Sequence, residues 1–130
     1  MTDHAKPTTP LADRLAELLA RFGSDFNRHC KDVARYYSAD FTAIVGDDPV
    51  GRPDYLASIT TMYEAGARDI RFDVDLRRDV SADVILASGT THVLDANGAD
   101  YASRFTILCG DEAGILRFLH VHSSPARLLA

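Results

Sequence analysis

The second half of the chain contains four consecutive strand patterns joined by short turns, and this feature restricts the fold most. Apolar and charged residues alternate over 70–77, which is typical of a strand with one buried face. Further strands are predicted over 84–94, over 101–109 and from 116 to 125, and Asp95-Ala96-Asn97-Gly98 is the strongest hairpin signal. Strands longer than the mean of about 5–6 residues must twist and curl, and Gly89 inside one of them suits a bulge. The pattern therefore predicts a curled antiparallel sheet.

The first half of the chain predicts helices that cover this sheet. Thr9 is expected to be an N-cap, with Pro10 at the first position of a helix that ends near residue 29. Its apolar stripe consists of Leu11, Leu15, Leu18, Phe22 and Phe26. Gly23 weakens this helix by about 1 kcal/mol relative to alanine, so two consecutive helices are the alternative. The remaining predictions are a short helix over 33–38, a strand over 41–45, a loop over 46–51 and a helix over 53–66.

Helices followed by a curled antiparallel sheet indicate an α+β fold. We expect the sheet to wrap around the long N-terminal helix and to leave a cone-shaped internal pocket at its open end. A chain of 130 residues suits one domain, predicted over 10–126, with 1–9 as a disordered arm.

Composition excludes several classes of partner. The net charge is −5 and the basic residues are scattered, which argues against nucleic acid and anionic membranes. Cys30 and Cys109 have no metal or redox spacing and are expected to be buried thiols. No apolar run approaches the ~20 residues of a membrane span, and no signal peptide or phosphate loop is present, so we expect a cytoplasmic protein without a cofactor.

The last strand predicts one wall of the pocket. Because strand residues alternate between faces, Leu116, Phe118, His120 and His122 are expected to share one side. The two imidazoles would then lie about 7 Å apart along the strand, next to two large apolar groups. Such a combination of apolar and titratable side chains is typical of a binding pocket.

Three roles are open for His120 and His122. They could act as general acid or base, or orient a ligand carbonyl. They could form half of a metal site, for which His92 is the available third imidazole. They could also be a packed or interface pair, bonded to the backbone and to Ser123 or Ser124.

Several phrases of the sequence, taken in their order and spacing, match those of a known family. They are Phe26-Asn27-Arg28-His29 through Asp32, Tyr36 and Asp40-Phe41, then Gly51-Arg52, Arg104-Phe105-Thr106 and His120-x-His122-Ser123-Ser124. With them the chain resembles the nuclear transport factor 2-like superfamily, and within it the SnoaL-like small proteins, from about Leu11 to Pro125. The ending also resembles the association domain of calcium/calmodulin-dependent kinase. The resemblance implies the conical fold but no single activity, because the superfamily includes isomerases, cyclases, epoxide hydrolases, transport adaptors and oligomerisation domains.

The ketosteroid isomerase branch of this superfamily uses an Asp base, a Tyr from the first helix and a protonated Asp from the sheet. The resemblance places Asp48, beside Asp47, near the position of the base. Phe22 stands where the Tyr is expected, and Ala102 or Ser103 where the second Asp is expected. Phenylalanine cannot donate a hydrogen bond to an enolate oxygen, so this chemistry is doubtful. The alternative is that the two aspartates are solvated turn residues.

The candidate ligand contacts are Phe22, Phe26, Tyr63, Arg104 and His92. Tyr63 is preferred over the other tyrosines because it shares a helix face with Leu56, Ile59 and Thr60. Arg104 either binds a ligand carboxylate or forms a structural ion pair with Asp73, Asp75 or Asp95, and the ion pair is favoured.

The chain is therefore predicted to bind a small, mainly apolar molecule that carries a carbonyl or hydroxyl group. Cofactor-free isomerisation, cyclisation or hydration is an option, with His120, His122 and Asp48 as the candidate catalytic groups. No metal is predicted.

The alternative function is a non-catalytic assembly or adaptor domain that associates through the sheet. The opposite side of the last strand carries Ile115, Leu119 and Val121 around Arg117, so that both faces of the sheet need a cover. We therefore expect a homodimer through the sheet.

Overall fold

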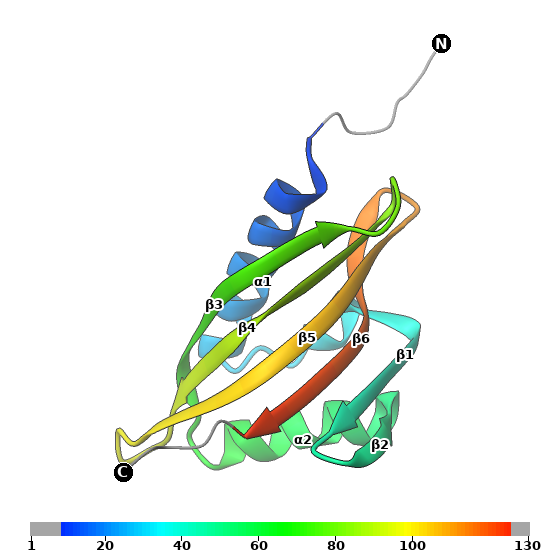
Figure 1. Cartoon of the computed structure of the whole chain (residues 1–130). Helices are drawn as coiled ribbons and strands as arrows, with labels where there is room; N and C mark the ends of the chain where they lie inside the picture. Colours follow the sequence, from blue (N-terminus) through cyan, green and yellow to red (C-terminus); the bar gives the residue numbers. More distant parts are fainter. Residues whose placement is uncertain (1–8, 126–130) are drawn as a thin grey trace.

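A six-stranded sheet curls around a long N-terminal helix in the computed structural model, which describes residues 9–125 (Figure 1). The elements are α1 (Leu11–Asn27), a 3-10 helix η1 (Val33–Tyr36), β1 (Tyr37–Val45), β2 (Asp48–Gly51), α2 (Arg52–Glu64), β3 (Arg68–Asp79), β4 (Val84–Leu94), β5 (Asp100–Glu112) and β6 (Ile115–Pro125). The predicted α+β class, with a curled sheet around the first helix, is confirmed. The predicted arm lies outside the described residues except for Thr9, and so does residue 126.

The strands are ordered β2-β1-β6-β5-β4-β3, so that β2 and β3 form the two edges. All neighbours are antiparallel except β1 and β6, which run parallel. The prediction of an antiparallel sheet is wrong for this pair, because no hairpin joins the two strands and fixes their direction. Gly89 was expected to accompany a bulge, and the register of β3 against β4 does shift between Val74 and Leu76, beside this glycine.

Helix α1 is continuous, which settles the alternative of two consecutive helices. It starts after Pro10, the N-cap residue, and no side chain caps it, so the predicted cap by Thr9 is wrong. Gly23 lies in the buried face of this helix, and a Cβ atom there would be 3.6 Å from Cγ2 of Ile70. The glycine therefore permits a close approach of α1 to β3.

The region between the two α-helices differs most from the prediction. The helix expected over 33–38 is only the four-residue η1, and β1 begins at Tyr37 instead of residue 41. The loop expected over 46–51 contains β2, which pairs with β1 from Val45 and Asp48 onward. Gly46 has a φ of 62°, so Gly46 and Asp47 form the two-residue turn of a tight hairpin.

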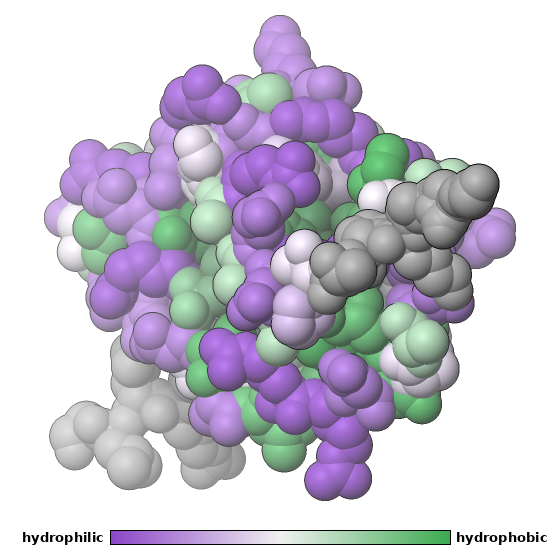
Figure 2. Space-filling view, turned by 90° about the horizontal axis from the view of Figure 1, so that it is seen from above, coloured by the Kyte–Doolittle hydropathy of each residue, from purple (hydrophilic) through white to green (hydrophobic). Residues whose placement is uncertain are grey.

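The core lies between the apolar stripe of α1 and the concave face of the sheet. Figure 2 views the end of the molecule that carries the β3–β4 and β5–β6 turns, where hydrophilic residues predominate and hydrophobic ones form scattered patches. Val80 and Ile115 are the large apolar residues exposed near these turns, at 59% and 52%. No helix within residues 9–125 is both long and apolar enough to cross a membrane.

Asp25 is a buried carboxylate at the end of α1 and holds this end of the molecule together. It accepts hydrogen bonds from the Tyr36 hydroxyl at 2.5 Å, from Arg35 at 2.5 Å and from Arg28. The Tyr36 bond and then the Arg28 bond contribute most to lowering the pKa of Asp25 from 3.8 to about 2. One carboxylate therefore ties η1 to α1.

This cluster predicts a specific acid sensitivity. The folded-state pKa of Asp25 lies below its ordinary value, so its contribution to stability is complete above about pH 4 and is lost as the pH falls toward 2. We expect Asp25→Asn to lower the melting temperature at pH 7 and to flatten its fall between pH 4 and 2. Circular dichroism melts over this pH range measure both effects. Asp32→Asn, at an exposed carboxylate that also pairs with Arg35, is the control. An acid transition in Asp25→Asn as steep as in the wild type would contradict this role.

Candidate functional site

A cavity of about 160 Å³ lies between α1, α2 and the concave face of the sheet. Its lining consists of Phe22, Phe26, Tyr37, Tyr55, Ile59, Met62, Ile70, Thr91, Val93, Ser103, Phe105, Ile107, Phe118, Val121 and Ser123. None of these residues carries a charge at neutral pH. The predicted contacts Phe22 and Phe26 are among them, and hydroxyl groups are the only polar side-chain groups in this wall.

Two tyrosines, Tyr37 and Tyr55, place phenol hydroxyl groups in the lining of the cavity. Tyr37 is 5% exposed on β1, and Tyr55 lies in the first turns of α2, with a distance of 5.6 Å between the ring centroids. Burial raises the pKa of Tyr37 well above its usual range and that of Tyr55 to about 12. Both phenols therefore keep their protons at neutral pH, and each is a hydrogen-bond donor as well as an acceptor.

The two histidines of the last strand do not face this cavity. Phe118 pairs with Cys109, which is fully buried, whereas His120 pairs with Leu108 on the other face of β5. Two residues of β6 therefore oppose one step of β5, and the extra residue is Leu119. The expectation that His120 and His122 share a face with Leu116 and Phe118 is wrong.

A glycine on the neighbouring strand makes this bulge possible. A Cβ atom on Gly110 would lie 2.7 Å from Cδ1 of Leu119, so the leucine side chain occupies the space that a larger residue would fill. Beyond the bulge Val121 and Ser123 take the inward positions, and both line the cavity. Gly110 lies near the end of β5, just beyond the strand predicted over 101–109, and a glycine inside a strand is the sequence signal for such an irregularity.

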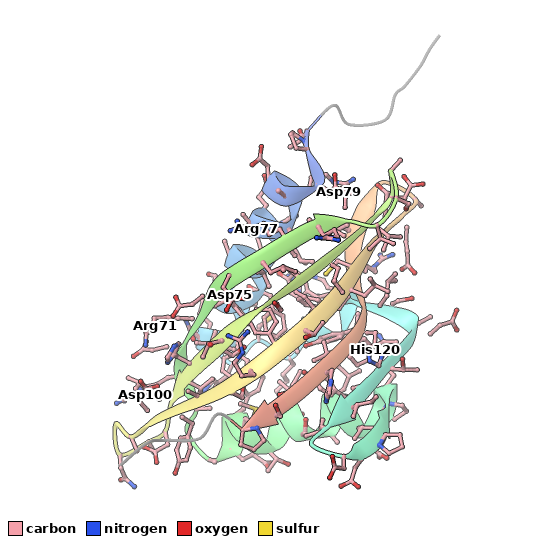
Figure 3. The ribbon with its side chains drawn as sticks, in the orientation of Figure 1. Arg71, Asp75, Arg77, Asp79, Asp100 and His120 are labelled. Carbon is pink, nitrogen blue, oxygen red and sulfur yellow. The ribbon has the colours of Figure 1, made fainter. Side chains whose placement is uncertain are left out.

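Both histidines lie on the convex face, where His120 is partly buried and His122 is exposed. Nδ1 of His120 lies 2.8 Å from the hydroxyl oxygen of Thr42 on β1, and Figure 3 shows His120 between β6 and β1. His122 is exposed and pairs in register with Thr106 and Ile44. Over residues 9–125 no group of three or more metal-ligating side chains comes together.

His92 and Arg104 also lie on the convex face. Nε2 of His92 is 3.1 Å from a carboxylate oxygen of Asp73, and Nδ1 is 3.6 Å from one of Asp100. Arg104 donates a hydrogen bond to Asp75 at 2.8 Å, which is the structural ion pair favoured by the sequence. Neither side chain lines the cavity.

Asp48 and Tyr63 are likewise outside the cavity. Asp48 is exposed on β2. The Tyr63 hydroxyl donates to the carbonyl oxygen of Cys30 at 3.1 Å, and its ring stacks on His29 at 4.6 Å between centroids. Tyr63 belongs to a groove between α2 and the segment around η1.

Helix α2 thus has two apolar faces. The face of Tyr63, which was expected to contact the ligand, is not the face that lines the cavity. Leu56, Thr60 and Tyr63 face the groove near η1, whereas Tyr55 and Met62 face the cavity. Ile59 lies between the two faces and lines both hollows. The signal for the inner face was the spacing of Tyr55, Ile59 and Met62 by four and three residues. Tyr37 was among the tyrosines over which Tyr63 was preferred, and the start of its strand was predicted four residues too late.

No protein-family model matches the sequence, and a search of curated proteins gives no match. Solved structures do match. A nuclear transport factor 2-like protein of unknown function from Shewanella oneidensis has a TM-score of 0.77 at 19% identity, covering 88% of this chain and 99% of its own. A ketosteroid isomerase-like protein from Erwinia carotovora atroseptica has a TM-score of 0.68 at 18% identity, covering 89% of this chain and 96% of its own.

A third structure, a putative calcium/calmodulin-dependent protein kinase II association domain from Xanthomonas campestris, has a TM-score of 0.73 at 18% identity. The match covers 99% of this chain and 97% of that one. Identities this low establish the fold and not the activity. The expected nuclear transport factor 2-like fold is thereby confirmed, and the resemblance to SnoaL-like proteins stays a prediction.

Proposed function

We propose that this protein binds a small, neutral, mainly apolar molecule with a carbonyl or hydroxyl group in the cavity among α1, α2 and the sheet. The observation that carries the proposal is the uncharged lining with two phenols, those of the buried Tyr37 and the partly buried Tyr55. A charged ligand would lose its hydration in this cavity without gaining a counter-ion. A carbonyl or hydroxyl oxygen would accept a hydrogen bond from a phenol.

The size of the cavity favours a single ring. A cavity of about 150 Å³ in another protein holds benzene, whereas drug-sized ligands occupy roughly 300–1,000 Å³. The 160 Å³ available here therefore suits a cyclohexanone or a phenol and excludes a four-ring steroid.

Binding is favoured over proton transfer. Among residues 9–125 no carboxylate or imidazole lines the cavity, and the pKa of Tyr55 is raised to about 12, far from the neutral range that suits a general base. The phenols can polarise a bound carbonyl but do not abstract a proton at neutral pH. The proposed function is therefore ligand binding.

Removing a phenol should weaken the binding of an oxygen-bearing ring. We expect Tyr37→Phe or Tyr55→Phe to reduce the affinity for cyclohexanone about fivefold, the worth of a hydrogen bond of roughly 1 kcal/mol. Isothermal titration calorimetry measures this loss. Affinity for benzene should remain unchanged, because benzene accepts no such bond.

Tyr63→Phe is the matched control, since it removes a phenol that lies outside the cavity. Affinity for cyclohexanone should also be constant between about pH 6 and 9, because burial raises the pKa of both cavity phenols. Equal affinities in Tyr37→Phe, Tyr55→Phe and the wild type, or no saturable binding of any single-ring compound, would refute the proposal.

The alternative of an assembly domain, the homodimer and the cytoplasmic location stay predictions. The bulge changes which residues such an association would use. Val121 lines the cavity and is not available to a partner. Leu119 lies on the convex face, together with Leu108 and with Leu86, which pairs with Leu108.

A further inference from the structure

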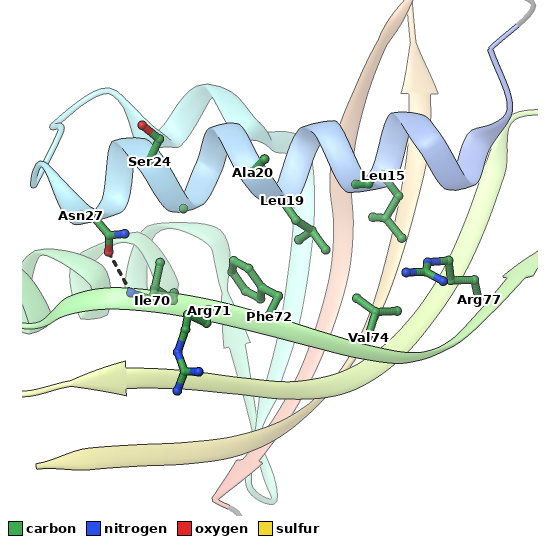
Figure 4. Close-up of a pocket in the computed structure, with 12 residues that line it drawn as sticks. Leu15, Leu19, Ala20, Ser24, Asn27, Ile70, Arg71, Phe72, Val74 and Arg77 are labelled. Atoms are coloured by element: carbon green, nitrogen blue, oxygen red, sulfur yellow. Dashed lines mark hydrogen bonds between the residues drawn. The ribbon is translucent and has the colours of Figure 1, made fainter.

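Another hollow, of about 460 Å³, lies between α1 and the edge strand β3 (Figure 4). Strand β3 pairs only with β4, so its other edge is open along this hollow. Leu15 and Leu19 from α1 and Phe72 and Val74 from β3 give the hollow an apolar floor. Its volume lies within the range of roughly 300–1,000 Å³ that is typical of sites for small molecules.

Small residues on α1 keep this groove open. Ala16, Ala20 and Ser24 are exposed along the helix and line the groove in place of larger side chains. At one end the side-chain oxygen of Asn27 accepts a hydrogen bond from the backbone N–H of Ile70 at 2.8 Å. The groove therefore has a closed polar end and an apolar middle.

Of the described residues that line the groove, only Arg71 and Arg77 are charged. Arg71 lies at the Asn27 end, within 4.0 Å of Asp100, and in Figure 4 its guanidinium points away from α1. Arg77 lies at the other end and pairs in register with Ala87, whose side chain is fully buried in the concave face. Its guanidinium therefore extends on the α1 side of β3, as Figure 4 shows.

Arg77 has no counter-ion in the groove. Within residues 9–125 no carboxylate forms an ion pair with it, and Asp79, two residues further on the same side, is exposed and makes no such contact. Most arginines of the described chain do have such partners, as Arg14 has in Asp111. A guanidinium beside an apolar floor recognises a carboxylate, because it offers paired N–H donors in a fixed plane.

We propose that the groove between α1 and β3 binds an aliphatic carboxylate, with the carboxylate on Arg77 and the alkyl chain on Leu15, Leu19 and Phe72. The site is separate from the cavity, and the two share only Ile70 in their linings. The proposal does not depend on the function proposed for the cavity.

The test is calorimetric titration of the full chain with decanoate. We expect Arg77→Gln to weaken binding about fivefold, as for an exposed ion pair, and raised salt to weaken wild-type binding similarly. Arg78→Gln is the matched control, because Arg78 pairs in register with Leu86 on the convex face. Ala20→Phe should abolish decanoate binding by filling the groove, and should leave cyclohexanone binding in the cavity intact.

Three outcomes would overturn the proposal. Arg77→Gln and Arg78→Gln could have equal affinities for decanoate, or decanol could bind as tightly as decanoate. Decanoate could also lose affinity in Tyr55→Phe and keep it in Ala20→Phe, which would place it in the cavity. A wild-type melting transition of Ala20→Phe in circular dichroism shows that this variant is folded, so its loss of decanoate reports on the groove whether or not the cavity binds cyclohexanone.

Discussion

Replacing Gly89 by alanine should destabilise the fold by more than about 3 kcal/mol, the largest effect expected from any single methyl group in this protein. A Cβ atom at this position would lie 2.0 Å from the carbonyl oxygen of Asp73 and 2.9 Å from Cα of Val74. Both contacts are with backbone atoms, so the bulge in β3 would have to move. We expect the melting temperature to fall by roughly 10 °C or more, measured by scanning calorimetry.

Gly23→Ala is the matched control, because Gly23 is also buried but its Cβ would meet Ile70 at 3.6 Å, an ordinary contact. This substitution removes a glycine from the middle of a helix and should be neutral or stabilising by up to about 1 kcal/mol. The two substitutions thus add the same methyl group with different results. A loss below 1 kcal/mol in Gly89→Ala would show that β3 and β4 do not approach as closely as described.

The bulge in β3 opposite Gly89 is one of the local features from which the sheet could be predicted. Long alternating runs, the Asp95–Gly98 turn and the glycine inside β4 each report on their own neighbourhood, and all of them agree. The parallel pairing of β1 with β6 could not be predicted in this way. It joins the strands that come first and last along the chain, so that no short turn connects them.

The candidate site was harder to predict, for a physical reason. Alternation fixes the faces of a strand only while every step is regular, and one extra residue at Leu119 exchanges the faces of all that follow. Because of this one residue, His120 lies on the convex face and not in the cavity wall where it was predicted. Phe22 and Phe26 were placed correctly because their helix has no such irregularity.

Phe22→Ala should have the second large effect, and it tests the cavity directly. The Phe22 ring lies within about 6 Å of five other rings, from residues Phe26, Tyr36, Tyr37, Phe72 and Phe118. It is 5% exposed, and truncating a buried phenylalanine costs about 3–5 kcal/mol. Urea unfolding, with the slope checked for two-state behaviour, measures this loss.

The same substitution should change which ligands bind. Phe22 lines the cavity of about 160 Å³, so its removal enlarges a space that was limited to one ring. We expect Phe22→Ala to bind in this cavity a two-ring alcohol such as naphthol, for which the wild-type cavity is too small, and to regain part of its stability as the ligand fills the space. Ile85→Ala removes a fully buried side chain that lines neither the cavity nor the groove between α1 and β3, and it should lose about 2–5 kcal/mol of stability without gaining naphthol binding. If both variants gained naphthol to the same extent, the new binding would come from a loosened core, and the cavity would not be the ligand site.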